Sequence, residues 1–281
     1  MISVKDLSFS YTSRPFIKNT SFEVKSGEIF GFLGPSGAGK STLQKILTGL
    51  LTGYKGSVTV NGEEAGHHSD GFYENIGVDF EFPSLYEKLT ARENLSFFAS
   101  LYKKHKDIDL LLSSVGLLND ADKKAGEFSK GMKSRLNFIK ALLHDPQLLF
   151  LDEPTSGLDP SNSRTMKDLI LEENARGKTI ILTTHNMYDA TELCDRVAFI
   201  VDGSIKALDT PGNLIMGRGA SKLSYTYVEN GEERSAETPL GGTSGDEKLM
   251  MLLRENRLRS IHSTEPTLND IFLELTGRRL Q

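Results

Sequence analysis

The sequence is poor in residues that cross-link a chain or anchor it in a membrane. Its 281 residues include one cysteine, Cys194, and no tryptophan. A single cysteine cannot form a disulfide within the chain, which favours a reducing compartment. No run approaches the roughly 18 uncharged apolar residues of a membrane-spanning helix, and residues 1–5 start no signal peptide. We therefore expect any role at a membrane to require a partner protein.

Neither sign of charge dominates. The 33 Lys and Arg residues stand against 38 Asp and Glu residues, a net charge of -5. This balance gives no overall attraction to nucleic acid or anionic lipid. The length predicts one large domain with a small appendage. We place the large domain at residues 1–216 and the appendage at 217–281, beginning with a glycine-rich linker at 217–221.

Apolar runs and helical patterns follow one another in the order of an α/β nucleotide fold. Four nearly continuous apolar runs predict strands of a parallel sheet that is buried on both faces. Alternation predicts an antiparallel edge sheet, with Leu7, Phe9 and Tyr11 on one strand face. Spacings of three and four residues predict helices, including a helical subdomain inserted at about 83–145, in which Leu95, Phe98, Leu101 and Tyr102 share one helix face. The four runs are 29–33, 148–151, 180–182 and 197–201.

The last third of the chain predicts a separate small α+β unit. Leu223, Tyr225 and Tyr227 alternate before Asn230-Gly231, a hairpin signal that also occurs at residues 202–203. Residues 249–253 have a helical pattern. Thr267 with Asp270 three positions later predicts a capping box that opens a last helix.

The strongest signal is the glycine-rich loop at 34–41, which reads GPSGAGKS between a predicted buried strand and a helix. In this phosphate-loop pattern, glycines let successive N–H groups and the helix N-terminus face phosphates. Lys40 should reach the β and γ phosphates, and the Ser41 hydroxyl should bind Mg²⁺. The alternative, an ordinary glycine-rich turn, is disfavoured by the flanking strand and helix. We assign to nucleotide binding Gly34, Pro35, Ser36, Gly37, Ala38, Gly39, Lys40, Ser41 and Thr42, with Thr42 beginning the helix.

Two carboxylates, Asp152 and Glu153, end the predicted strand at 148–151. The carboxyl ends of parallel strands face the crevice in which α/β sheets bind ligands. Asp152 suits a Mg²⁺ ligand, directly or through water, and Glu153 suits a general base for the attacking water. Acidic residues after a strand also occur as simple loop starts. The glycine-rich loop favours the functional interpretation.

Three further motifs resemble those of ABC transporter ATP-binding subunits, and the resemblance covers about residues 1–214. The sequence FSKGM at 128–132 resembles the signature motif, SGLD at 156–159 the D-loop, and His185 the switch histidine. The resemblance implies a P-loop NTPase core of the ABC type, with an antiparallel β subdomain and an inserted helical subdomain. It also implies ATP and Mg²⁺ as cofactors and ATP hydrolysis as the reaction.

The same resemblance implies partners. Two copies would form a head-to-tail homodimer, in which Ser129 and Gly131 of one subunit close over ATP bound by the other. Asp159 would lie near that nucleotide. A separate integral membrane permease would hold the dimer on the cytoplasmic face of the membrane, and no nucleic acid is implied.

Three of these residues have simpler alternative roles. Ser129 and Gly131 stand just before the amphipathic pattern of a helix, and Ser129 could be only its N-cap. His185 could contact the γ-phosphate or be a polar residue at a strand end. Tyr11 matches the adenine-stacking aromatic of the family, and it could equally pack against Phe9.

One position departs from the family pattern. Glu81 stands where the Q-loop usually has glutamine. A carboxylate still binds Mg²⁺ and accepts a hydrogen bond from water, but it lacks the amide donor and adds negative charge near Asp152 and Glu153. Together with the form of the signature motif and the ending at 265–272, this resembles an exporter branch with separately encoded permeases. Two other hypotheses are a soluble ABC ATPase acting on ribosomes or DNA, and a regulatory ATP sensor.

Weaker candidates have ordinary explanations. His67-His68 could suggest a metal site but lacks a Cys or carboxylate frame. Residues 103–106, a short basic run, predict an exposed helix end. Phe82, Leu85 and Tyr86 could face the permease or pack within the helical subdomain.

Overall fold

The computed structural model describes residues 1–81, 84–217, 222–264 and 266–277. These residues divide into two compact units, the first Met1–Leu208 and the second beginning at Asp209. Most of the linker predicted at 217–221 lies outside the described residues. Within the described ranges, no helix is both long enough and apolar enough to span a bilayer.

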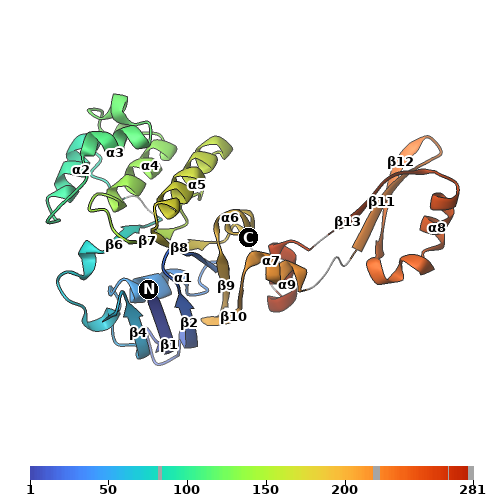
Figure 1. The fold of residues 1–281 in the computed structure, drawn as a ribbon, viewed down its shortest axis with the longest axis horizontal. Helices are drawn as coiled ribbons and strands as arrows, with labels where there is room; N and C mark the ends of the chain where they lie inside the picture. Colours follow the sequence, from blue (N-terminus) through green and yellow to red (C-terminus); the bar gives the residue numbers. More distant parts are fainter. Residues whose placement is uncertain (82–83, 218–221, 265, 278–281) are drawn as a thin grey trace. The chain divides into compact units, whose positions relative to one another are not determined.

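The first unit is built on a six-stranded sheet whose order is β10-β9-β3-β8-β7-β6 (Figure 1). β3, β7 and β8 are buried along their whole length, as expected for strands covered on both faces. The ladders among β6, β7, β8, β3 and β9 are all parallel, so the carboxyl ends of these strands share one edge. The strands are β3 (Ile29–Leu33), β6 (Ile76–Asp79), β7 (Leu148–Asp152), β8 (Thr179–Thr184), β9 (Arg196–Val201) and β10 (Ser204–Asp209).

A second sheet of the first unit is antiparallel, with the order β2-β1-β4-β5. Helix α1 (Lys40–Leu47) buries Leu43, Ile46 and Leu47 in a core that both sheets share. The prediction that Tyr11 lies on the strand face of Leu7 and Phe9 was wrong, because β1 ends at Phe9 and Tyr11 is 56% exposed beyond it. The strands are β1 (Ile2–Phe9), β2 (Ile17–Val24), β4 (Lys55–Val60) and β5 (Glu63–Glu64).

Helices connect β6 to β7 and group together beside that side of the sheet (Figure 1). A capping box between Thr90 and Glu93 opens α2. The prediction that Leu101 shares the buried face of Leu95 was wrong, because α2 ends at Ala99 and Leu101 is 66% exposed. The connecting helices are α2 (Ala91–Ala99), α3 (Ile108–Ser114), η3 (Leu118–Asp120), η4 (Ala125–Glu127) and α4 (Lys130–Ala141). Elsewhere the unit holds η1 (Ala65–His67), η2 (Phe72–Glu74), α5 (Pro160–Ala175) and α6 (Met187–Leu193).

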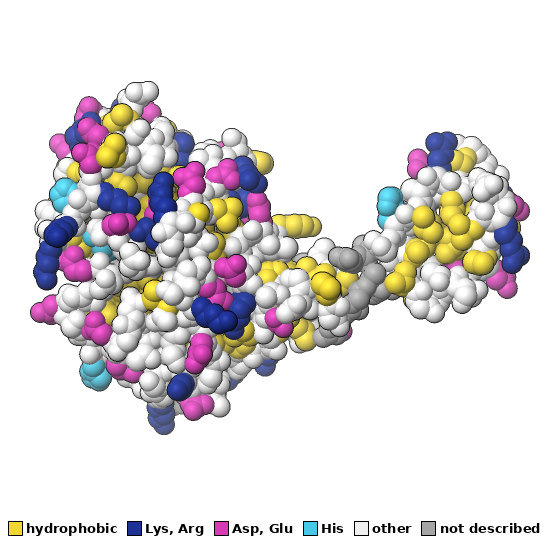
Figure 2. Space-filling view, viewed as in Figure 1, with side chains coloured by type: hydrophobic (Ala, Val, Ile, Leu, Met, Phe, Trp, Pro, Cys, Tyr) yellow, Lys and Arg dark blue, Asp and Glu magenta, His cyan; other side chains and the backbone are white. Residues whose placement is uncertain are grey.

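The second unit contains a three-stranded antiparallel sheet, β12-β11-β13. The predicted hairpin at Asn230-Gly231 is confirmed, and both residues have positive φ. Leu249 and Leu252 of α8 pack against Tyr225 and Tyr227 of β11. Figure 2 shows hydrophobic side chains gathered on the visible face of this unit. Its elements are α7 (Pro211–Met216), β11 (Lys222–Glu229), β12 (Glu232–Pro239), η5 (Leu240–Gly245), α8 (Glu247–Arg254), β13 (Leu258–Thr264) and α9 (Leu268–Thr276).

Candidate functional site: a phosphate loop with converging carboxylates

The glycine-rich loop joins β3 directly to α1. The helix begins at Lys40, not at Thr42 as predicted, because Gly39 takes the left-handed conformation with φ 113° and turns the chain straight into the helix. The Lys40 ammonium folds back over the loop and donates to the carbonyl oxygen of Gly34 at 2.7 Å. Only 7% of Lys40 is exposed. Burial lowers the pKa of Lys40, and the negative charges of Glu153 and Asp152 partly oppose this effect.

Gly34 is required by a close contact with the backbone, and Gly39 by its positive φ together with a side-chain contact. A Cβ on Gly34 would lie 2.2 Å from the carbonyl oxygen of Ile200, and one on Gly39 would lie 2.7 Å from Cδ1 of Ile17. At Gly37, which also has positive φ, a Cβ would meet nothing within 4 Å. The loop is thus tight where it touches the sheets and open at Gly37. This shape fits the phosphate groups of a nucleotide.

A pocket of about 260 Å³ lies over the loop. It is bordered by residues from five places in the chain, so the fold brings together most of the predicted site. Phe16 also lines the pocket, although the sequence pattern gave it no role. The lining residues are Phe16, Ser36, Gly37, Ala38, Gly39, Lys40, Ser41, Thr42, Glu81, Asp152, Glu153 and His185.

Glu153 makes polar contacts with two other residues that line this pocket. One carboxylate oxygen lies 3.7 Å from the Lys40 ammonium, and the other lies 2.9 Å from Nδ1 of His185. Glu153 has a φ of 51°, a backbone conformation that costs energy for a residue other than glycine. The Thr183 hydroxyl, from the neighbouring strand, donates to the Asp152 carboxylate. Glu153 therefore contacts both Lys40 and His185, which joins the three predicted catalytic residues in one group.

The three predicted metal ligands, Ser41, Asp152 and Glu81, all line the same pocket. Hydroxyl and carboxylate oxygens are the donors that Mg²⁺ prefers. Among the described residues there is no group of three or more His, Cys, Asp or Glu side chains that could hold a metal ion. The donor set therefore fits an ion that is also held by nucleotide phosphates rather than one caged by protein alone.

Tyr11 does not line this pocket. Its hydroxyl lies 3.0 Å from Oγ1 of Thr42, and its ring makes edge contacts with Phe9 and Phe16. The alternative of packing against Phe9 is therefore realised, with ring centroids 4.8 Å apart. The contact with Thr42 keeps the ring close to the phosphate loop.

Ser129, Gly131 and Asp159 do not line the phosphate-loop pocket either. Ser129 caps α4 by accepting a hydrogen bond from the amide of Met132. Gly131 lies inside the first turn of α4, not before the helix as predicted, and a Cβ there would lie 2.5 Å from Cγ of Asn162. Asp159 caps α5 and also accepts from the Asn162 side chain at 2.5 Å. Asn162 therefore lies next to both the signature residue Gly131 and the D-loop residue Asp159 of the same chain.

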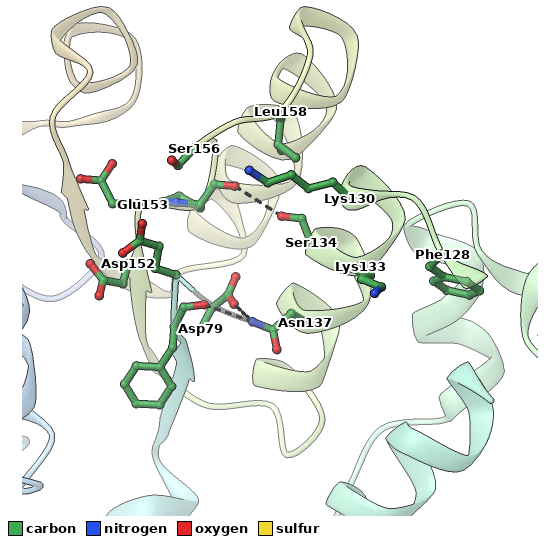
Figure 3. A pocket seen from close by; sticks show the side chains of 13 residues that line it. Asp79, Phe128, Lys130, Lys133, Ser134, Asn137, Asp152, Glu153, Ser156 and Leu158 are labelled. Carbon is green, nitrogen blue, oxygen red and sulfur yellow. Dashed lines mark hydrogen bonds between the residues drawn. The ribbon is translucent and has the colours of Figure 1, made fainter. Parts of the chain in front are cut away.

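A second cavity, of about 330 Å³ (Figure 3), shares Glu81, Asp152 and Glu153 with the first. Asp79, at the end of β6, lines it and is only 5% exposed. Burial raises the pKa of Asp79 to about 7, although Lys140 and a hydrogen bond from Asn137 act in the opposite direction. No sequence motif assigned a role to Asp79 or Asn137. A charged residue ending a short apolar strand was the one signal available.

The weaker candidates make ordinary packing and ionic contacts. The His68 ring stacks on Phe72 with centroids 4.4 Å apart. The basic run at 103–106 lies in the irregular connection between α2 and α3, not at a helix end, and its Lys106 pairs with Asp145 at 2.8 Å. Phe82 lies outside the described residues. Tyr86 is 49% exposed, and its ring contacts Phe97 and Phe98.

Comparisons with known proteins agree with this geometry. The ABC transporter family matches residues 17–156. The chain is 49% identical to a fluoroquinolones export ATP-binding protein of Mycobacterium tuberculosis, over 100% of this chain and 94% of that protein. It is 38% identical to Nod factor export ATP-binding protein I of a Rhizobium strain, over 97% of this chain and 95% of that protein.

A solved structure of the ATP-binding subunit of an ABC transporter matches with a TM-score of 0.70 and 31% identity, covering 78% of this chain and 93% of that one. A glycine-rich loop and two carboxylates at the carboxyl edge of a parallel sheet are the features that bind and hydrolyse ATP in this fold. The chain therefore belongs to the ABC transporter family as an ATP-binding, ATP-hydrolysing subunit.

Proposed function

We propose that this chain is the motor of an ABC exporter, which binds Mg·ATP, pairs with a second copy and drives a separate membrane permease. The observation that carries the proposal is the convergence of Lys40, Asp152, Glu153 and His185 on the phosphate-loop pocket. The relatives described above are named as export ATP-binding proteins. The two alternatives, action on ribosomes or DNA and a regulatory sensor, gain no support from them.

The contacts suggest how the residues act. Lys40 is paired with Glu153 at 3.7 Å, so a bound triphosphate would draw its ammonium toward phosphate oxygens and leave the Glu153 carboxylate to accept a proton from water. His185, 2.9 Å from Glu153, would hold that carboxylate in place. Bound Mg²⁺ would neutralise phosphate charge, with Ser41, Asp152 and Glu81 as the side chains nearest to it.

The signature segment completes the site only in a dimer. Ser129 and Gly131 lie outside the pocket of their own chain. The amide groups at the start of α4 form a positive helix end, which would favour the γ-phosphate of a nucleotide bound by a second copy. We therefore propose a head-to-tail homodimer with two composite sites.

The helices between β6 and β7 offer a surface for the permease. Tyr86 and Phe97 are 49% and 44% exposed, and their rings contact each other at 5.0 Å. Exposed aromatic residues are enriched where proteins meet. With the permease bound there, the chain would lie on the cytoplasmic face of the membrane.

Nucleotide titration tests the site assignment. We expect Lys40→Ala to weaken Mg·ATP binding at least tenfold, because the ammonium supplies a charge-assisted contact to phosphate. Lys45→Ala is the matched control, since Lys45 is an exposed lysine of the same helix that does not line the pocket. Equal affinity of the Lys40 variant and the control would refute the assignment.

A mixing experiment tests the dimer. Lys40→Ala and Ser129→Arg subunits should each be inactive alone. A mixed dimer would contain one composite site in which Lys40 and Ser129 are both intact, so mixing should restore part of the ATPase activity. If mixed dimers form, as shown by differently tagged subunits, and remain inactive, the head-to-tail arrangement is wrong.

A further inference from the structure

One face of α4 holds the chain segment that carries Glu81. Asn137 and Lys140 are about one helical turn apart, and both are buried, with exposed fractions of 1% and 9%. The Asn137 amide donates to the Asp79 carboxylate (Figure 3) and, at 3.4 Å, to the carbonyl oxygen of Phe80. The Lys140 ammonium donates to the Ser84 hydroxyl at 3.0 Å. The segment is thus fixed on both sides of Glu81.

These contacts are polar and buried, so they cost desolvation that a simple packing contact would avoid. Burial lowers the pKa of Lys140, and the charge of Asp79 partly opposes this effect. The Lys140 ammonium also lies 4.8 Å from the centre of the Phe98 ring. Within the described residues, Oδ1 of Asn137 has no hydrogen-bond partner. Replacing both sides of such a buried polar contact by apolar residues of similar volume is often neutral or stabilising, so stability alone does not require it.

The sheet holds the start of the segment, because Asp79 pairs with Leu151 of β7. Phe80 and Glu81 lie past the end of β6 and border the cavity of about 330 Å³. Glu81 is exposed and also lines the phosphate-loop pocket. Where a segment borders open space, a few directional hydrogen bonds decide its position.

We propose that Asn137 and Lys140 are positioning residues that set where the Glu81 carboxylate stands in the phosphate-loop pocket. This inference rests on the role proposed above for Glu81. The signature residue Ser129 caps the start of the same helix. A shift of α4 when a second copy engages that end would therefore move Glu81, and the composite site would adjust its own carboxylate as it closes.

An exchange of side chains tests the contact. Asn137→Asp places two carboxylates face to face, and we expect kcat for ATP to fall about tenfold, or about 1.4 kcal/mol, with KM for Mg·ATP within about twofold. The double variant Asp79→Asn, Asn137→Asp reverses the donor and the acceptor and should regain most of kcat. An unchanged kcat in the single variant, or no recovery in the double variant, would overturn the proposal.

A double-mutant cycle with Glu81→Ala distinguishes positioning from general stability. If Asn137 acts through Glu81, then Asn137→Ala should lower kcat severalfold in the wild-type background and hardly at all in the Glu81→Ala background. Equal fold-losses in the two backgrounds would contradict this inference. If Glu81→Ala alone leaves kcat unchanged, the proposed role of Glu81 fails, and that result is distinct from a failure at Asn137.

Asn94→Ala is the matched control for this cycle. Asn94 is a fully buried asparagine of the same helical subdomain, and its side chain bonds the backbone of Tyr86, Leu89 and Thr90. It should lower the melting temperature without changing kcat of the folded protein. Lys140→Arg should keep the donor to Ser84 and retain kcat, whereas Lys140→Met should lower it. A kcat loss for Asn94→Ala as large as that for Asn137→Ala would assign both to stability.

Discussion

The two units bury different kinds of side chain. At the carboxyl edge of its large sheet the first unit buries Lys40, Asp79 and Asp152, each less than 9% exposed. The core of the second unit is made of Tyr225, Tyr227, Leu249 and Leu252. Burying an unpaired charge destabilises the folded state, whereas burying leucine and tyrosine side chains stabilises it. Charged groups that stay buried despite this cost indicate a functional site, so we place the chemistry in the first unit.

Backbone conformation separates the units in the same way. Among the described residues with positive φ other than glycine, all are Asn or Asp except Glu153. Asn and Asp tolerate this conformation, and the second unit uses it at Asn230 and Asn256 in turns. Glutamate has no such tolerance. The strained residue is thus the one whose carboxylate contacts Lys40 and His185, as expected where strain is kept at a functional site.

The largest predicted effect is that of Glu153→Gln. The amide cannot accept a proton from water, so we expect ATP turnover to fall about 10²- to 10⁴-fold while Mg·ATP still binds. Phosphate release at saturating ATP, together with a nucleotide titration, measures both properties.

Glu28→Gln is the control for Glu153. Glu28 is 7% exposed and precedes β3 at the end of the strand opposite the phosphate loop, where it pairs with Arg196 at 3.1 Å. This change should lower stability and leave turnover per folded molecule unaltered. Turnover of Glu153→Gln equal to that of Glu28→Gln would remove Glu153 from the chemistry.

Much of the fold followed from local patterns. The apolar runs predicted β3, β7, β8 and β9 to within about two residues because strands buried on both faces have continuous apolar sequence. The capping box at Thr267 and Asp270 is confirmed for the same local reason. The end of α2 was misplaced because Leu101 and Tyr102 continue the helical spacing after the helix has stopped at Ala99.

The site residues also fall into those that local sequence predicted and those that it did not. Motif residues were found because their chemistry lies within a few positions of sequence. The contact of Asn137 with Asp79 joins residues 58 positions apart, and that of His185 with Glu153 joins strands from separate segments. No local pattern encodes such pairs. Asn162 escaped notice for the same reason, since its place against Gly131 depends on how α4 and α5 meet.

A core truncation in the second unit tests whether that unit is separable from the chemistry. Leu252 is 1% exposed, so Leu252→Ala should cost about 2–5 kcal/mol of local stability through the cavity it leaves. Hydrogen exchange of α8 amides in the full chain should quicken, while kcat and KM of the ATPase stay the same. A parallel loss of turnover would show that the second unit also contributes to ATP hydrolysis.

Gly131→Ala tests how little room the first unit leaves at its signature segment. The added Cβ would lie 2.5 Å from Cγ of Asn162, so we expect a cost of about 1–3 kcal/mol and lower turnover. Asn162→Ala in the same chain should relieve the overlap and recover stability. Gly241→Ala in the second unit is the control, because its Cβ would meet nothing within 4 Å. Equal effects of the two substitutions on stability and turnover would contradict the steric argument.

The smallest effect should come from helix caps, which serve the same purpose in both units. Asp246 caps α8 and Asp107 caps α3, each accepting from backbone amides of the first turn. Replacing either by Ala should cost about 1 kcal/mol locally and leave turnover intact. Hydrogen exchange of the two helices measures each loss.

The wild-type cap of α8 should also weaken with acid. A hydrogen bond from the Leu249 amide lowers the pKa of Asp246 below its ordinary value. A carboxylate with a lowered pKa stabilises the folded state above the ordinary pKa, and this contribution is lost as pH falls through the lowered value. Exchange of α8 amides, corrected for the intrinsic pH dependence, should therefore rise in that range and show no such rise in Asp246→Ala. An identical rise in the variant would mean that another group titrates in this range and that the charge of Asp246 does not account for the acid sensitivity of α8.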